Sequence, residues 1–247
     1  MVRDPVCLLD LEPRQAAAMA VNEGRAYYFC SDSCKQTFQA QPRTFLNKAP
    51  AMRLTVGVMG SASNDHPSSV KSQARLLGEA VAHQGFILVT GACPGLPYEC
   101  ATGAREADGW SVGISPALSL DEHVHKYQSP SDMFDVLIYT GSGLMGREVT
   151  NIRSSDMVVI AGGRSGTLGE FAIAYDEGKL IGVLQDSGGI TEAIPGILAS
   201  FGDKDTGARV IYEADPVRLI ENLASAYTSQ HYLHPSCFCM DDAPASG

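Results

Sequence analysis

The chain is poor in positive charge. It contains 18 Lys and Arg residues against 28 Asp and Glu residues, which gives a formal net charge of −10. A nucleic-acid binder needs a basic face against the phosphates, so this balance disfavours a nucleic-acid polymer as a partner. It leaves open a small anionic ligand that is held by two or three local arginines.

Long hydrophobic runs are also missing from the 247 residues. No run approaches the roughly 18 apolar residues that cross a bilayer, and the start, "MVRDP", lacks the apolar stretch of a signal peptide. We therefore expect a cytoplasmic protein with no membrane partner. In that compartment the seven cysteines are expected to be thiols or metal ligands rather than disulfides.

No Walker lysine motif occurs, which disfavours a P-loop ATPase. Instead, short apolar segments alternate with helical patterns after residue 53. The expected strands are 54–59, 86–90, 110–114, 135–140, 157–161, 180–184 and 209–213, and the expected helices are 68–83, 95–107, 144–154, 167–177 and 216–226. Strands that are apolar at every position need cover on both faces, so the pattern predicts a doubly wound, Rossmann-like parallel α/β sheet.

Three of these strands end in small or glycine-rich turns, "GSAS" (60–63), "TGACPGL" (90–96) and "GGRSGT" (162–167). Glycine lets a ligand approach the main chain, and the amides that open the next helix attract anions. Each loop alone is also explained by a tight turn and a helix cap, but three loops at one edge of a sheet predict a phosphate or nucleotide cleft. The ligand-binding residues expected there are Gly60, Ser61, Gly91, Gly95, Gly163, Gly166 and Thr167.

Charged residues flank the third loop on both sides. Glu170 falls in the first turn of the following helix, where an acid caps the helix or, alternatively, orients water and stabilises positive charge on a ribose whose base departs. The preceding helix carries Arg147, Asn151 and Arg153, which we expect to contact an anionic ligand. The alternative is a set of surface arginines that pair with acids such as Glu148.

The segment "GREVTNIRSSDMVVIAGGRSGTLGE" (146–170) resembles the LOG superfamily, often misnamed lysine decarboxylases. Arg147 takes the place of that family's catalytic arginine, and Glu170 takes the place of the glutamate in its PGGxGTxxE loop. The segment "TGACPGLPYECATGA" (90–104) is similar to the second signature. The resemblance implies hydrolysis of a nucleoside 5′-monophosphate to free base and ribose 5-phosphate, without metal or organic cofactor. It also implies a homodimer or a higher even oligomer.

The chain departs from that pattern in both signatures. Gly162 stands where the family has proline, Arg164 replaces a glycine, and Ala92 and Cys93 replace two more. The pattern is closer to the branch similar to molybdenum-cofactor carrier proteins. The alternative function is therefore a carrier or sensor of a nucleotide or pterin-type anion, linked to metal handling. A metal chaperone with an α/β scaffold is a third reading, but it leaves the arginine–glutamate pair unexplained.

The N-terminal segments "DPVC" and "YYFCSDSC" resemble the YHS domain, a small module found beside heavy-metal transport proteins. Cys7, Cys30 and Cys34 are its candidate metal ligands, and three thiolates suit Zn²⁺ or Cu⁺. A metal would staple a core that is too small to stand alone. Buried structural thiols without a metal are the alternative.

We expect a YHS-like module at 1–48, a LOG-like Rossmann domain at 54–228 and a partly disordered tail at 229–247. Cys93 and Cys100 are expected to be core fillers, and the "HVH" at 123–125 is expected in a loop or a substrate lid. A fourth metal ligand is not evident. The candidates are water, a partner's residue, or one of His234, Cys237 and Cys239.

Overall fold

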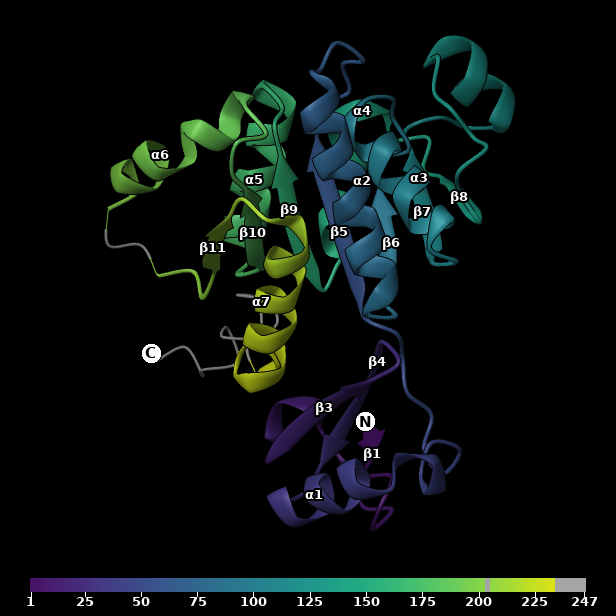
Figure 1. The fold of residues 1–247 in the computed structure, drawn as a ribbon, viewed down its shortest axis with the longest axis vertical. Helices are drawn as coiled ribbons and strands as arrows, with labels where there is room; N and C mark the ends of the chain where they lie inside the picture. The colour runs from purple at the N-terminus through teal and green to yellow at the C-terminus, as the bar shows by residue number, and fades with distance from the viewer. Residues whose placement is uncertain (203–204, 234–247) are drawn as a thin grey trace, which may run out of the picture.

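The computed structural model describes residues 1–202 and 205–233 as two modules (Figure 1). A small N-terminal module lies at one end, and a larger module with a central sheet follows it. Residues 229–233, the first part of the expected tail, are described: α7 (Pro216–Ser229) ends at Ser229, and η5 (His231–Leu233) follows it. The suggested tail ligands His234, Cys237 and Cys239 lie outside the described residues.

The larger module contains a seven-stranded sheet in which every neighbouring pair is parallel. Its order is β11-β10-β9-β5-β6-β7-β8. The strands are β5 (Thr55–Gly60), β6 (Ile87–Thr90), β7 (Trp110–Ser115), β8 (Val136–Tyr139), β9 (Met157–Ala161), β10 (Leu180–Leu184) and β11 (Arg209–Glu213). The predicted α/β fold is confirmed. The chain winds outward in opposite directions from β5 and β9, which makes their carboxyl ends the switch point where such sheets bind ligands.

Both faces of the sheet are buried, which explains the uniformly apolar strands. Met157 and Val159 point into one core, whereas Val158 and Ile160 point into the other. The first core is covered by α2 (Ser68–His83), α3 (Leu96–Glu106) and α7 (Pro216–Ser229), and the second by α4 (Gly143–Arg153), α5 (Ser165–Asp176) and α6 (Ile194–Ser200). The sequence patterns did not indicate α6, nor the π-helical turn η3 (Glu122–Lys126) in the predicted loop.

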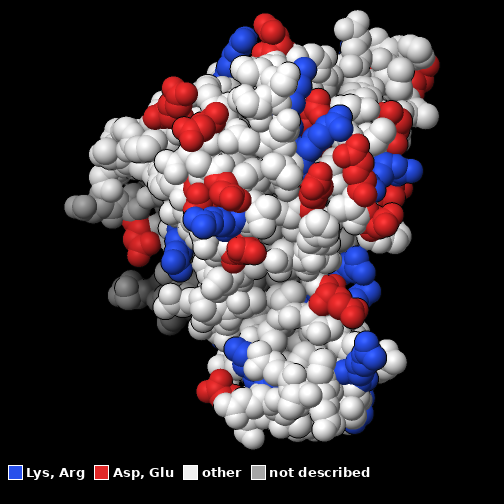
Figure 2. Space-filling view, viewed as in Figure 1, with Lys and Arg blue, Asp and Glu red and all other residues white. Residues whose placement is uncertain are grey.

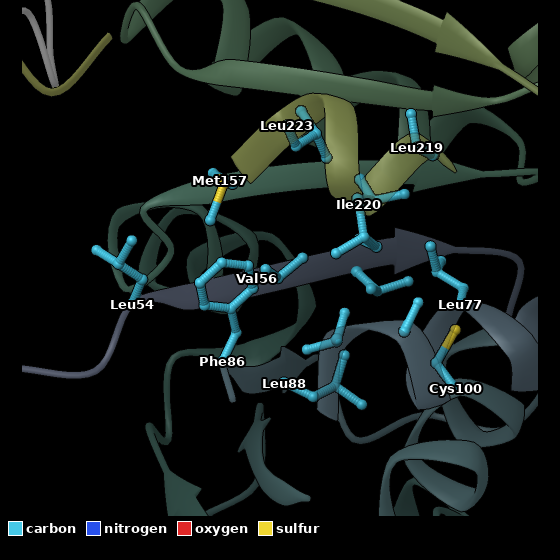
Figure 3. Close-up of a cluster of buried hydrophobic side chains, with 14 of the residues drawn as sticks. Leu54, Val56, Leu77, Phe86, Leu88, Cys100, Met157, Leu219, Ile220 and Leu223 are labelled. Atoms are coloured by element: carbon cyan, nitrogen blue, oxygen red, sulfur yellow. The ribbon is translucent and has the colours of Figure 1, made fainter. Parts of the chain in front are cut away.

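Figure 3 shows the first core, in which Leu77 of α2 and Leu223 of α7 belong to the same buried cluster as Val56 and Leu88 of the sheet. Fully buried aliphatic side chains each contribute roughly 1.5–3 kcal/mol relative to an exposed position. This core fixes the first half of the sheet and thereby the turns at its carboxyl edge. None of the described helices is long and apolar enough to cross a membrane.

The N-terminal module is a short α+β unit with its own small core. Its elements are β1 (Val2–Arg3), β2 (Asp10–Leu11), η1 (Pro13–Gln15), β3 (Ala18–Asn22), β4 (Arg25–Phe29), α1 (Asp32–Ala40) and η2 (Pro42–Thr44). Phe29 and Phe38 are fully buried within it, with ring centroids 5.3 Å apart. Ser31 caps α1 by accepting a hydrogen bond from the Cys34 amide at 3.3 Å, which places Cys34 one turn after Cys30.

The two modules share one hydrophobic core. Met19 of β3 belongs to the same buried cluster as Phe86 and Tyr227 of the larger module. The hydroxyl of Tyr232 donates a 3.4 Å hydrogen bond to the Ala16 carbonyl across the junction. The hairpin of the small module is therefore buried on both faces.

Candidate functional site

A cavity of about 350 Å³ opens at the carboxyl ends of β5 and β9. Its walls are the turns after β5, β6 and β9 and the first halves of α4 and α5. It lies at the switch point of the sheet, where the three glycine loops converge. Seven of the predicted residues line it: Gly60, Ser61, Gly91, Arg147, Gly166, Thr167 and Glu170.

Arg147 reaches this cavity from the first half of α4 and is 7% exposed. Its Nε has no hydrogen-bond partner among the described residues, and its guanidinium forms no ion pair within 4.0 Å there. The side chain lies directly over Gly91, because a Cβ at that position would overlap with Nη1 of Arg147. Glycine in the β6 turn therefore makes room for a buried cation.

Glu170 and Glu148 bring two buried carboxylates to the same cavity, each 6% exposed. Burial raises the pKa of Glu170 to about 7; Glu148 adds to the rise and Arg147 opposes it. Burial also raises the pKa of Glu148, whose Oε2 has no hydrogen-bond partner in the described part of the chain. A carboxyl group with a pKa near 7 holds and releases a proton at neutral pH.

The turn from β9 into α5 is shaped by two glycines with left-handed backbones, Gly162 (φ 59°) and Gly163 (φ 90°). The first hydrogen bond of α5 runs from the Leu168 amide to the Arg164 carbonyl at 2.9 Å. The amides of Gly166 and Thr167 precede that bond, so they have no carbonyl partner within the helix. They are suited to an anion, and the helix dipole adds to this preference.

The predicted residues Gly95 and Gly163 support the loops rather than line the cavity. The Gly95 amide donates to Oδ1 of Asn64 at 3.2 Å, and a side chain at Gly95 would collide with the Ser61 carbonyl. A side chain at Gly163 would collide with Thr167.

Asn151 and Arg153, which were expected to contact the ligand, are not among the residues that line the cavity. The Asn151 amide donates to the Met59 sulfur at 3.0 Å, behind the cavity wall. Arg153 is the last residue of α4, at the opposite edge of the sheet, and its Nε lies 2.7 Å from Oε1 of Glu177. Only the first half of α4 faces the carboxyl ends of the strands.

Glu148, Cys93 and Arg164 also line the cavity, although none of them was among the predicted binding residues. Cys93 was expected in the core, yet it is half-buried in the cavity wall, where burial raises the pKa of its thiol to about 11. Arg164 is exposed at the rim. Nothing in the sequence separates Glu148 from an ordinary surface acid, because its burial depends on how α4 packs against α5.

The thiols of Cys7, Cys30 and Cys34 gather at one end of the small module. The Sγ of Cys30 lies 3.5 Å from that of Cys7 and 3.7 Å from that of Cys34, and all three cysteines are free thiols. Thiolates around a tetrahedral ion with Zn–S bonds of about 2.3 Å stand roughly 3.8 Å apart. The spacing therefore fits a metal ion, as the sequence suggested for this module.

Asp4 is a further potential metal ligand that the sequence did not indicate. Its carboxylate lies within 4.8 Å of the three sulfurs, in the cluster of potential ligand atoms that the described residues form. Oδ1 accepts hydrogen bonds from the amides of Val6 and Cys7, and Oδ2 accepts one from the Cys30 amide at 2.9 Å. Asp4 thus ties the loop of Cys7 to the strand end of Cys30.

The face of the molecule in Figure 2 shows Lys and Arg side chains scattered among Asp and Glu. On this face the basic residues form no continuous patch of the kind that follows a nucleic-acid backbone.

Comparison with known proteins gives matches for both modules. Residues 53–220 match the SLOG cluster4 family, and residues 2–49 match the YHS domain. An uncharacterized protein of Archaeoglobus fulgidus is 32% identical over 132 residues, which cover 53% of this chain and 80% of that protein. A cytokinin riboside 5′-monophosphate phosphoribohydrolase of Mycobacterium tuberculosis is 30% identical over 127 residues, or 51% of this chain and 64% of that enzyme.

The N-terminal part also matches a copper-transporting P-type ATPase of Rhizobium leguminosarum, with 37% identity over 46 residues. This segment is 19% of this chain and 6% of the ATPase. Among solved structures, the molybdenum cofactor binding protein of Rippkaea orientalis is 28% identical with a TM-score of 0.59, over 72% of this chain and 99% of that protein. The molybdenum cofactor carrier protein of Chlamydomonas reinhardtii is 28% identical with a TM-score of 0.55, over 70% of this chain and 99% of that protein.

Proposed function

Because the chain belongs to the SLOG cluster4 family, we propose that its cavity binds a nucleoside 5′-monophosphate and that Arg147 and Glu170 cleave the N-glycosidic bond. One observation carries the proposal. Two buried side chains of opposite charge face one cavity, and neither forms a hydrogen bond or ion pair with a described residue. Buried charges are normally paired, so this arrangement is suited to a ligand that pairs them.

In the proposed complex, the phosphate lies at the start of α5. The amides of Gly166 and Thr167 donate to it, and the guanidinium of Arg147 supplies the balancing positive charge. Arg164 at the rim adds a second cation. The phosphate anchors the ribose beside Glu170, four residues after Gly166 on the same face of α5.

The proposed reaction breaks the bond between C1′ of the ribose and the ring nitrogen of the base. Positive charge develops on the ribose as the bond breaks, and the ionised carboxylate of Glu170 stabilises it. Glu170 then accepts a proton from the water whose oxygen bonds to C1′. The departing base keeps the electron pair of the broken bond and takes up one proton from solvent, and Glu170 returns its proton to solvent. The products are a free base and ribose 5-phosphate, and no metal or organic cofactor takes part.

The mycobacterial relative, named as a phosphoribohydrolase, supports this activity. A second candidate is a carrier that holds a nucleotide or pterin-type anion in the same cavity without cleaving it. The two molybdenum cofactor proteins with similar folds favour this candidate. So does Arg164, whose long side chain replaces a glycine in the phosphate loop.

The decisive experiment incubates the protein with a panel of nucleoside 5′-monophosphates and measures free base and ribose 5-phosphate. Glu170→Gln is expected to abolish base release while keeping ligand binding, and Arg147→Ala is expected to weaken both. The exposed Glu221→Gln serves as the matched control. If a nucleotide or pterin raises the melting temperature of the wild type and no base is ever released, the carrier function replaces the hydrolase.

We further propose that the small module, residues 1–48, binds Zn²⁺ or Cu⁺ through Cys7, Cys30 and Cys34. The sulfur spacing supports it, and Asp4 retains acceptor capacity on Oδ2 for a fourth bond. Elemental analysis after purification under reducing conditions is expected to give one ion per chain. The double variant Cys30→Ser/Cys34→Ser is expected to give none, and metal retained in that variant would contradict the proposal.

We also propose that the larger module, residues 54–228, forms a homodimer or a higher even oligomer in the cytoplasm. The edge strand β8 presents the apolar side chains of Val136 and Ile138, which are 45% and 46% exposed. Leu144 and Met145 at the start of α4 are also exposed, and Leu144 lines the cavity. Light scattering is expected to give a mass that corresponds to an even number of chains. Ile138→Lys places a charge on the exposed edge strand and is expected to lower that mass.

A further inference from the structure

The contacts around the Glu148 carboxylate do not explain why a charged group is buried there. The side chain is 6% exposed, lines the cavity, and leaves Oε2 without a hydrogen-bond partner among the described residues. Arg147 is its sequence neighbour, and adjacent residues on a helix point in different directions, so the two charges do not pair. An unpartnered buried carboxylate is costly, which favours a partner outside the chain.

The carboxylate packs against a part of α5 where two glycines leave the helix surface without side chains. Oε1 lies 3.5 Å from the place of a Cβ at Gly166, and Oε2 lies 3.5 Å from the place of a Cβ at Gly169. Glu170 follows on the same helix and lines the same cavity. The carboxylate therefore stands within a turn of both the proposed phosphate site and the proposed catalytic acid.

We infer that Glu148 is a ligand-binding residue whose carboxylate accepts hydrogen bonds from the vicinal hydroxyl groups of a ribose. This inference rests on the proposed function, because it takes the phosphate to lie at the start of α5. A carboxylate that close to the phosphate meets the sugar rather than the base. Its two oxygens match two neighbouring O–H donors, and such bonds to a charged acceptor are strong.

The consequence is selectivity for ribonucleotides. A site that is built to accept hydrogen bonds from a ligand discriminates against an analogue that lacks the donor, since the buried acceptor is then left unpaired. The ligand class is accordingly a ribonucleoside monophosphate or ribose phosphate, and 2′-deoxy analogues are rejected.

The test compares binding of AMP and 2′-deoxy-AMP by calorimetry in a Glu170→Gln background, which suppresses cleavage. With Glu148 present, we expect AMP to bind roughly tenfold or more tightly than the deoxy analogue. Glu148→Ala is expected to bring the ratio of the two affinities close to one. Glu221→Gln, which changes an exposed acid on α7, is expected to keep the wild-type ratio.

Three further measurements separate the possible outcomes. If Glu148→Ala lowers the melting temperature and leaves the ratio unchanged, the residue is structural and the inference is overturned. If the variant alters discrimination between GMP and IMP, which differ by one amino group, the carboxylate faces the base and the ribose assignment is wrong. If neither a monophosphate nor ribose 5-phosphate binds the wild type, the proposed function itself fails, and this inference fails with it.

Discussion

One cavity is lined by three buried charged side chains, those of Arg147, Glu148 and Glu170. Charged side chains are rarely buried in native proteins unless they are paired. None of the three forms an ion pair within 4.0 Å with a described residue. The cost is visible in the raised pKa values of both carboxyl groups. Binding and catalytic sites commonly hold such groups in place before the ligand binds, at a cost in the stability of the fold.

The pKa of Glu170 predicts how stability depends on pH. The folded value of about 7 exceeds the usual 4.5, so the folded state holds the proton more tightly than the unfolded chain. Stability is therefore lost as pH rises from about 4.5 through 7, by roughly 3 kcal/mol in total. Glu170→Gln removes this loss. The melting temperature of the variant relative to wild type is expected to rise by about 6–12 °C between pH 4.5 and pH 8.

The control for that experiment is Glu221→Gln, whose difference from wild type is expected to stay constant across the same pH range. A constant difference for Glu170→Gln as well would show that the carboxyl group titrates normally. Activity is expected to move in the opposite direction to stability. The ionised carboxylate is the proposed active form, so kcat/KM rises as pH increases through about 7.

Gly91 offers a second test at the level of a single side chain. Its backbone is not left-handed, so alanine is sterically allowed there, but the new Cβ would overlap with the guanidinium of Arg147. The end of a long side chain gives way more easily than backbone. Gly91→Ala is therefore expected to displace Arg147 and to weaken nucleotide binding at least tenfold, while the melting temperature changes little. Wild-type affinity in this variant would show that Arg147 does not contact the ligand.

Among the elements, those with a strong apolar period were predictable from sequence and those formed by packing were not. Each β-strand from β5 to β11 was predicted to within two residues, because burial on both faces leaves a continuous apolar run. The seven-residue α6 and the π-helical turn η3 carry too short a pattern to be recognised. The three glycine loops lie at strand ends as expected, because glycine marks the turn that ends a strand.

The residues of the candidate site were also only partly predictable from the sequence. Arg147 and Glu170 were predicted and lie at one cavity, because their positions follow from the family pattern and from the strand ends. Arg153 was expected beside them only because it is an arginine on the same helix as Arg147. The structure places it at the other end of α4. Glu148 was missed because sequence does not reveal which face of a helix another helix will cover.

The contact between α2 and α3 gives a prediction at the level of elements. The two helices approach so closely that a Cβ at Gly103 would overlap with the Arg75 carbonyl, and one at Gly78 would overlap with the Cys100 carbonyl. Both obstacles are backbone atoms, which cannot move without separating the helices. Gly103→Ala is therefore expected to lower stability by about 1–3 kcal/mol in urea unfolding. Gly196→Ala, where no atom lies within 4 Å of the new methyl group, is expected to leave it unchanged or slightly raised.

At the scale of the whole molecule, the shared core decides whether the two modules unfold together. Met19 of the small module is 1% exposed and packs into the cluster that contains Phe86 and Tyr227. Below about 40–50 residues a domain rarely stands on its own core, and the larger module would expose these apolar side chains if it stood alone. We therefore expect one cooperative transition for the full chain in calorimetry.

Methionine substitutions at the junction test this cooperativity. Met19→Ala is expected to cost about 2–5 kcal/mol and to shift the whole transition to lower temperature, because the cavity it leaves lies in the core of both modules. Met52→Ala, at a residue 83% exposed in the connecting segment, is the matched control and is expected to have no measurable effect. Two separate transitions in the Met19→Ala variant, with the larger one unmoved, would mean that the modules unfold independently. A single shifted transition would mean that a metal bound to the small module also stabilises the nucleotide site, since binding to the folded state stabilises everything that unfolds with it.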